Sequence, residues 1–297
     1  MNAAAQSETL QPTDTVGALV EFGTAKLAAI GIATARLDTE VLLAHACGID
    51  RAGLYARWRS LVPADYRSHF GALIVRRQRR EPLQYIVGRQ EFWSLDFVVT
   101  PDVLIPRPET ELLVELALAV LSDAESGVPL PLRLCDLGTG SGCIAVALAR
   151  ELPHAEVWAL DTSAAALNVA KMNAQKHRVT DRVHLLASCG LAAAGGFRFD
   201  AIVCNPPYVS SRELQRAQPE LAWEPRHALD GGATGLAVIE RVVAEAPGYL
   251  REGGWLLMEM GADQVPAVER LARSAGFSSV AMRADYAGLP RALLAQR

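Results

Sequence analysis

From Pro108 to the C-terminus, helical periodicity alternates with short apolar runs, and this alternation limits the possible folds more than any other feature of the chain. We expect helices over 109–124, 142–151, 163–177, 235–250 and 264–275, and strands over 132–136, 155–160, 182–187, 199–204 and 254–260. Strands separated by helices form a mostly parallel sheet with right-handed crossovers. Two more strands, near 277–284 and 290–295, have no helix between them and should pair antiparallel. The sequence therefore predicts an α/β domain built on a mostly parallel seven-stranded sheet.

The N-terminal third of the chain has a different pattern. Residues 14–81 read as a small all-helical bundle, in which one helical face carries the apolar residues Val16, Leu19, Val20, Leu27 and Ile30. The stretch 84–100 reads as a β-hairpin, and the prolines in 101–108 make the next segment extended and stiff. We therefore predict three parts: a helical domain over 1–82, a hairpin and Pro-rich linker over 83–107, and the α/β domain over 108–297.

Composition argues against several classes of protein. The net charge is −4, so the chain lacks the basic excess typical of stable nucleic-acid binding. The five cysteines form no metal-ligand spacing, so no metal site is expected and a reducing compartment is favoured. No apolar run approaches the roughly 20 residues of a membrane span, and no signal peptide is evident. We expect a cytoplasmic monomer without membrane contacts.

The first chemical motif is a glycine loop between a predicted strand and a predicted helix, Gly138-Thr139-Gly140-Ser141-Gly142. Such a loop lets the backbone approach a ligand closely and presents the N–H groups of a helix N-terminus. A dinucleotide fold would place its third glycine at 143, where this chain has Cys143. The spacing resembles instead the first motif of the Rossmann-like methyltransferases, which bind S-adenosylmethionine. Asp161 ends the next strand, where a carboxylate can accept both ribose hydroxyls.

The second motif, Asn205-Pro206-Pro207-Tyr208, directly follows a predicted strand. Amide nitrogens are poor nucleophiles because their lone pair is delocalised. Two acceptors, Asn205 Oδ1 and the Pro206 carbonyl, can hold such a nitrogen against a sulfonium methyl group, while the prolines fix the turn. Tyr208 can lie flat on a planar target. The motif therefore indicates methylation of a nitrogen on a neutral planar group.

Longer segments resemble the release factor glutamine methyltransferases. The matching segments are Glu81–Gly88, Phe97–Glu111, Trp223–Pro225, Ala228–Gly232 and Asp285–Arg291, and the run TPDVLIPRPETE is the most specific part. The resemblance implies a Rossmann-like class I methyltransferase fold. It also implies methyl transfer from S-adenosylmethionine to the glutamine of the Gly-Gly-Gln motif in class-1 peptide-chain release factors, with the helical domain helping to dock the factor.

The same resemblance assigns roles to the residues of the two motifs. Gly138, Thr139, Gly140, Ser141, Gly142, Asp161 and Asn205 bind the cofactor; Asn205, Pro206, Pro207 and Tyr208 bind the glutamine; and Asn205, Pro206 and Tyr208 are catalytic. Arg107 and Glu109 are expected near the site without assigned roles. One departure is Ser188-Cys189-Gly190, where the family usually has an acidic–aromatic pair that contacts the adenine. Losing that carboxylate acceptor weakens cofactor binding by ~1–3 kcal/mol.

Three other functions remain open from the sequence. The chain could methylate a glutamine of a ribosomal protein, although that family tends to carry a PRSP-like stretch where this chain has PRPET. It could methylate an exocyclic amine of a nucleic-acid base, which the acidic balance disfavours. It could also be a non-catalytic binding protein that lost its cofactor through Cys189-Gly190, and the two intact motifs argue against this.

Overall fold

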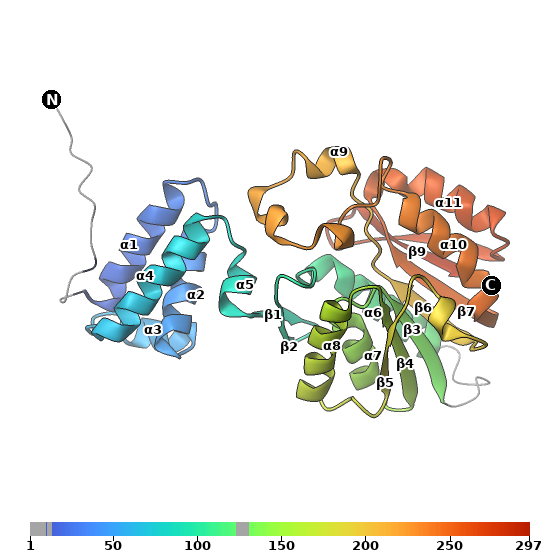
Figure 1. Cartoon of the computed structure of the whole chain (residues 1–297), viewed down its shortest axis with the longest axis horizontal. Helices are drawn as coiled ribbons and strands as arrows, with labels where there is room; N and C mark the ends of the chain where they lie inside the picture. Colours follow the sequence, from blue (N-terminus) through green and yellow to red (C-terminus); the bar gives the residue numbers. More distant parts are fainter. Residues whose placement is uncertain (1–9, 11–13, 123–130) are drawn as a thin grey trace. The chain divides into compact units, whose positions relative to one another are not determined.

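The computed structural model describes residue 10 and residues 14–122 and 131–297. Its contacts divide the chain into two compact units, and the division falls between Gly88 and Arg89. Each unit has its own elements (Figure 1). The first unit has one hydrophobic core and the second unit has two.

The first unit is a bundle of helices, as the sequence predicts. Its helices are α1 (Val16–Ala28), α2 (Ala35–Cys47), α3 (Arg51–Ala56), α4 (Ala64–Gln78) and α5 (Leu83–Val87). Leu19, Leu42 and Phe70 are fully buried in its core, which consists of residues between Val16 and Ile86. A buried ion pair joins Arg77 Nε on α4 to Asp38 Oδ2 on α2 at 2.7 Å.

The prediction of a β-hairpin beginning near Gln84 is wrong for its first residues. Residues 83–87 form helix α5, which follows Pro82 and ends at Gly88 in a left-handed conformation (φ 73°). Ile86 and Val87 favour strands by propensity, but Ile86 is buried in the bundle core, and packing overrides propensity. The hairpin itself lies later, over β1 (Arg89–Phe92) and β2 (Leu95–Val98).

The second unit contains the predicted seven-stranded sheet. Its strands are β3 (Leu132–Leu137), β4 (Ala155–Asp161), β5 (Val183–Ala187), β6 (Phe199–Cys204), β7 (Leu250–Glu259), β8 (Ser279–Ala284) and β9 (Pro290–Gln296). Their spatial order is β5-β4-β3-β6-β7-β9-β8. The first five strands of this order pair in parallel, whereas β9 is antiparallel to both β7 and β8. The antiparallel pairing of the last two strands confirms the prediction.

Helices cover both faces of the sheet (Figure 1). α6 (Glu111–Ser122), α7 (Cys143–Glu151) and α8 (Ala164–Lys176) share a core with one face, and α10 (Ala237–Tyr249) and α11 (Val265–Ser274) share a core with the other. Successive residues of a strand point to opposite faces, so Leu134 belongs to the first core and Cys135 to the second. Among the described residues, none of the helices has the length and apolar character needed to cross a membrane.

The hairpin belongs to the second unit. Phe92 and Phe97 are buried in the core beneath α6, α7 and α8. The buried Asn173 on α8 accepts a hydrogen bond from Val98 N at 2.7 Å and donates to Val98 O at 2.9 Å. A side-chain amide thus satisfies both backbone groups of one residue, which fixes β2 on the helix layer.

The parallel strands end at a common edge of the sheet, and the chain order reverses there between β3 and β6. In open α/β sheets this switch point leaves a crevice at the carboxyl ends of the strands. The loop after β3 and the long segment after β6 both begin at this edge. That segment contains α9 (Ser211–Leu214) and 3-10 turns at Pro219–Trp223 and Arg226–Ala228.

Candidate active site

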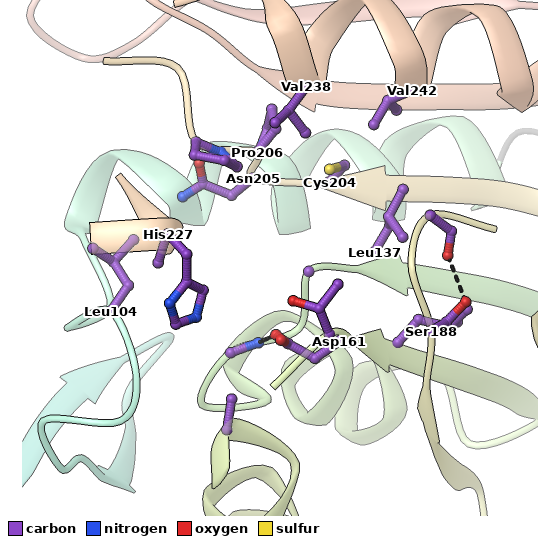
Figure 2. Close-up of a pocket in the computed structure, with 18 of the residues that line it drawn as sticks. Leu104, Leu137, Asp161, Ser188, Cys204, Asn205, Pro206, His227, Val238 and Val242 are labelled. Carbon is purple, nitrogen blue, oxygen red and sulfur yellow. Dashed lines mark hydrogen bonds between the residues drawn. The ribbon is translucent and has the colours of Figure 1, made fainter. Parts of the chain in front are cut away.

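A pocket lies at the switch point and brings together residues of both sequence motifs (Figure 2). Of the residues predicted for the site, Gly138, Gly140, Asp161, Asn205, Pro206 and Pro207 line it. Thr139, Ser141, Gly142 and Tyr208 are not among the residues that line it. In the view of Figure 2, Leu104 and His227 lie at one end of the pocket and Ser188 lies at the other.

The glycine loop is shaped by the end of the neighbouring strand. The Leu160 carbonyl accepts from Gly138 N at 2.8 Å and from Thr139 N at 2.9 Å. Gly138 and Gly140 have φ of 76° and 54°, a region that side chains with a Cβ rarely adopt. A Cβ on Gly138 would meet nothing within 4 Å, and one on Gly140 would meet only the Gly138 carbonyl at 4.0 Å. The loop therefore leaves an open cradle that any side chain would begin to fill.

Gly142 and Ser141 have a packing role instead. A Cβ on Gly142 would lie 3.1 Å from the Cβ of Ala170, so this glycine allows α7 to approach α8 closely. Ser141 is buried, and its carbonyl accepts from Asn173 Nδ2 at 2.8 Å. The residue that holds the hairpin thus also holds the glycine loop.

Asp136 is hydrogen-bonded to the glycine loop and to the start of α7. It is fully buried, and its Oδ2 accepts from Thr139 Oγ1 at 2.6 Å and from Ala145 N at 3.1 Å. Within the described part of the chain, its Oδ1 has no hydrogen-bond partner. Burial raises the pKa of Asp136 to about 7, because removing a carboxylate from water disfavours its charged form.

Asp161 ends β4 and faces the pocket. Its Oδ2 accepts from Gly140 N and its Oδ1 from Ser163 N, both at 2.8 Å. A carboxylate oxygen can accept two hydrogen bonds, so each oxygen retains capacity for a ligand. The two backbone contacts fix the carboxylate beside the glycine cradle, where it can receive a pair of hydroxyl groups.

The segment Asn205–Tyr208 and the next residue, Val209, are held by close backbone contacts with residues 229–235. Val209 N donates to Leu229 O, and Gly231 N donates to Val209 O at 2.8 Å. A Cβ on Gly231 would lie 2.7 Å from the Pro207 carbonyl, so only glycine permits this approach. Gln264 Nε2 donates to Tyr208 O at 3.0 Å. The segment is therefore fixed by backbone contacts as well as by its two prolines.

Beneath this segment, hydrogen bonds join Asn205, Tyr208, Thr110 and Glu259. Asn205 Nδ2 donates to Thr110 Oγ1 at 3.0 Å, and Thr110 Oγ1 donates to Glu259 Oε2 at 2.7 Å. The Tyr208 hydroxyl donates to Glu259 Oε1 at 2.9 Å. Burial raises the pKa of both Glu259 and Tyr208. Sequence reasoning missed Thr110 and Glu259, although Thr110 belongs to the PRPET run.

Arg107 and Glu109, which are expected near the site without assigned roles, have different environments. The guanidinium of Arg107 forms an ion pair with the buried Glu224 carboxylate, which also accepts from Ile105 N at 3.1 Å. This contact ties the Pro-rich segment to the turn before His227. The pKa of the buried Glu259 is raised slightly further by the charge of Glu109. Neither Arg107 nor Glu109 lines the pocket.

The segment that departs from the family pattern forms one wall. Ser188 and Gly190 line the pocket, and Ser188 Oγ donates to Gly190 O at 2.8 Å. Cys189 is exposed, and its Sγ lies 3.5 Å from Nη1 of Arg241, which also lines the pocket. This segment supplies no carboxylate to the pocket. Val238 and Val242 on α10 form an apolar surface nearby (Figure 2).

Two family models match the chain. The model described as the PrmC N-terminal domain matches residues 18–88, and the model described as the methyltransferase small domain matches residues 115–232. The first match falls within the helical unit. The second covers the glycine loop, Asp161 and the segment Asn205–Tyr208.

Curated relatives match over nearly the whole chain. The sequence is 43% identical over 278 residues to the release factor glutamine methyltransferase of Geobacter sulfurreducens, covering 93% of this chain and 95% of that protein. It is 46% identical over 261 residues to the protein of the same name from Burkholderia pseudomallei, covering 86% and 90%. Among solved structures, the catalytic domain of human METTL16 in complex with an RNA hairpin aligns with a TM-score of 0.57 at 17% identity, covering 73% of this chain and 80% of that one. That similarity shows the fold alone.

Proposed function

The chain belongs to the release factor glutamine methyltransferases, and we propose that its pocket holds S-adenosylmethionine beside a glutamine side chain of a class-1 release factor. The acceptor is the side-chain amide nitrogen of the glutamine in the Gly-Gly-Gln motif. Action as a monomer in the cytoplasm, without stable nucleic-acid binding, stays a prediction.

The residues present fit the cofactor. At the cradle formed by Gly138 and Gly140, a ligand can approach the backbone before α7 closely. Asp161 offers acceptors suited to ribose hydroxyls. Leu137, Val238 and Val242 supply apolar surface for a planar base. When bound, S-adenosylmethionine supplies an electrophilic methyl group on a sulfonium sulfur.

The residues of the chain make the glutamine nitrogen able to accept that group. Asn205 Oδ1 and the Pro206 carbonyl accept the two N–H bonds of the amide, which turns the face of the nitrogen toward the methyl group. As the methyl carbon would bond to the nitrogen and its bond to the sulfonium sulfur would break to leave a neutral thioether, the nitrogen would become positive and its N–H groups would become stronger donors. The two acceptors therefore bind the transition state more tightly than the ground state. The surplus N–H proton then leaves to water.

One observation carries this proposal: Asn205 and Pro206 line the same pocket as the glycine cradle and Asp161. Positioning of two reactants can lower a barrier by ~7–11 kcal/mol without any strong base. The experiment is transfer of labelled methyl from S-adenosylmethionine to purified release factor, with tRNA, rRNA and ribosomal proteins as competing acceptors. Label on the release factor glutamine supports the proposal; label on any other acceptor instead would refute it.

Asp161→Ala should act on cofactor affinity. The carboxylate makes charge-assisted hydrogen bonds, whose loss weakens binding by ~1.5–3 kcal/mol, about 10- to 150-fold. Calorimetric titration with S-adenosylmethionine measures the change directly. Unchanged affinity would remove Asp161 from the cofactor site.

A further inference from the structure

We propose that Thr110 and Glu259 are positioning residues that set which atom of the Asn205 amide faces the glutamine. This inference rests on the proposed function, because it concerns how Asn205 is presented to the substrate. The observation behind it is the chain of hydrogen bonds from Asn205 through Thr110 to the buried end of β7.

The direction of this chain follows from the chemistry of its last member. Both oxygens of Glu259 accept hydrogen bonds, one from the Tyr208 hydroxyl and the other from Thr110, so the single hydroxyl proton of Thr110 points to Glu259. Thr110 Oγ1 can then only accept from Asn205, and the amide must present Nδ2 to it. Oδ1 is left as the free polar atom of the Asn205 side chain, and Asn205 lines the pocket. A flipped amide would instead offer the substrate a donor, which cannot accept an N–H bond.

The same carboxylate also holds the other end of the motif. Glu259 Oε1 accepts from the Tyr208 hydroxyl at 2.9 Å while Oε2 accepts from Thr110. Glu259 and Thr110 are 1% and 2% exposed, so water does not compete for these bonds. One buried carboxylate thereby orients both Asn205 and Tyr208 before the substrate arrives. Misplacement of a reacting group by about 1 Å can cost about 100-fold in rate, so such preorganisation matters for kcat.

The test compares Thr110→Val, which removes the hydroxyl and keeps the shape, with Thr110→Ser, which keeps the hydroxyl. We expect Thr110→Val to lower kcat about 10- to 100-fold, with calorimetric cofactor affinity near that of the wild type. Thr110→Ser should retain most of kcat. A wild-type kcat in Thr110→Val, or equal losses in both variants, would overturn the proposal.

A second comparison asks whether Thr110 acts through Asn205. Adding Thr110→Val to Asn205→Ala should cause no further loss of kcat, because the residue that Thr110 orients is already absent. A further loss of the full single-variant size overturns the proposed route. Normal turnover in Asn205→Ala alone would instead refute the assigned role of Asn205, so the two failures are distinguishable.

Glu259→Gln keeps the test decisive if Thr110→Val does not fold. In glutamine only one of the two terminal positions carries an acceptor oxygen, so the side chain cannot accept from Thr110 at one position and from Tyr208 at the other. We expect kcat to fall while circular dichroism and cofactor binding remain near those of the wild type. An unchanged kcat in Glu259→Gln would show that the carboxylate does not set the orientation.

Discussion

Asn205 meets the substrate nitrogen most directly in the proposed reaction, since its side-chain oxygen is one of only two acceptors offered by the motif. We expect Asn205→Ala to lower methyl transfer about 100- to 1,000-fold, the usual effect of removing one preorganised polar group from a transition-state site. Cofactor affinity should change much less than turnover, since Gly138, Gly140 and Asp161 still line the pocket. Asn168→Ala, at an exposed position on α8, is the matched control. Near-normal turnover of Asn205→Ala on whole release factor would contradict the role.

Asp136 gives a second prediction, on stability. Its pKa is about 7 in the folded protein against 3.8 as the ordinary value, so the folded state retains a proton that the unfolded state loses. The contribution of Asp136 to folding stability therefore falls as the pH rises from about 4 to about 7. The difference between 3.8 and about 7 corresponds to roughly 4 kcal/mol as an upper bound.

Asp136→Asn removes this titration and retains an acceptor for Thr139 and Ala145. The variant should gain stability relative to the wild type as the pH rises from 5 to 8. Urea unfolding of both proteins at the two pH values measures this difference. A difference in unfolding free energy that stays constant across the range would show that the carboxylate does not titrate as described.

The position of the segment Asn205–Tyr208 depends on the close approach of the loop over 229–235. Gly231→Ala would place a Cβ 2.7 Å from the Pro207 carbonyl and 2.6 Å from the Gly235 carbonyl. We expect the segment to shift, lowering kcat about 100-fold for a displacement near 1 Å, with cofactor affinity largely kept. Gly196→Ala is the matched control, since its Cβ would meet nothing within 4 Å. Equal kcat in both variants would mean that the close approach of Gly231 does not position the segment Asn205–Tyr208.

Most of the α/β unit could be predicted because its elements have clear periodic patterns. Helix α5 could not, since burial of Ile86 in the bundle outweighs the strand propensity of 84–87. The glycine loop and the Asn-Pro-Pro-Tyr motif each follow a predicted strand directly, so the sequence predicts that both lie at the same edge of the sheet. Thr110 and Glu259 lie far apart in the sequence and meet only through the fold, so no local pattern could pair them.

The two units of the molecule have separate hydrophobic cores. The core of the first unit consists of residues between Val16 and Ile86, while both cores of the second unit begin at or after Phe92. Every residue predicted for the site lies in the second unit. We therefore predict that the second unit folds and binds cofactor alone, which leaves the first unit for another task.

That task, we predict, is recognition of the release factor. A glutamine side chain offers too few atoms to supply much affinity, so selecting one glutamine in one protein requires contacts away from the pocket. Deleting residues 1–88 should leave S-adenosylmethionine binding intact and raise the apparent KM for whole factor about 10-fold or more, with a smaller effect on kcat, because remote contacts act equally on ground and transition states. A short Gly-Gly-Gln peptide should be a weak substrate for both forms, with little difference between them. Steady-state kinetics on factor and peptide measure this, after circular dichroism and calorimetry establish that the truncated chain is folded and binds cofactor. If the truncated chain methylates whole factor as efficiently as the full chain, recognition must lie within the second unit.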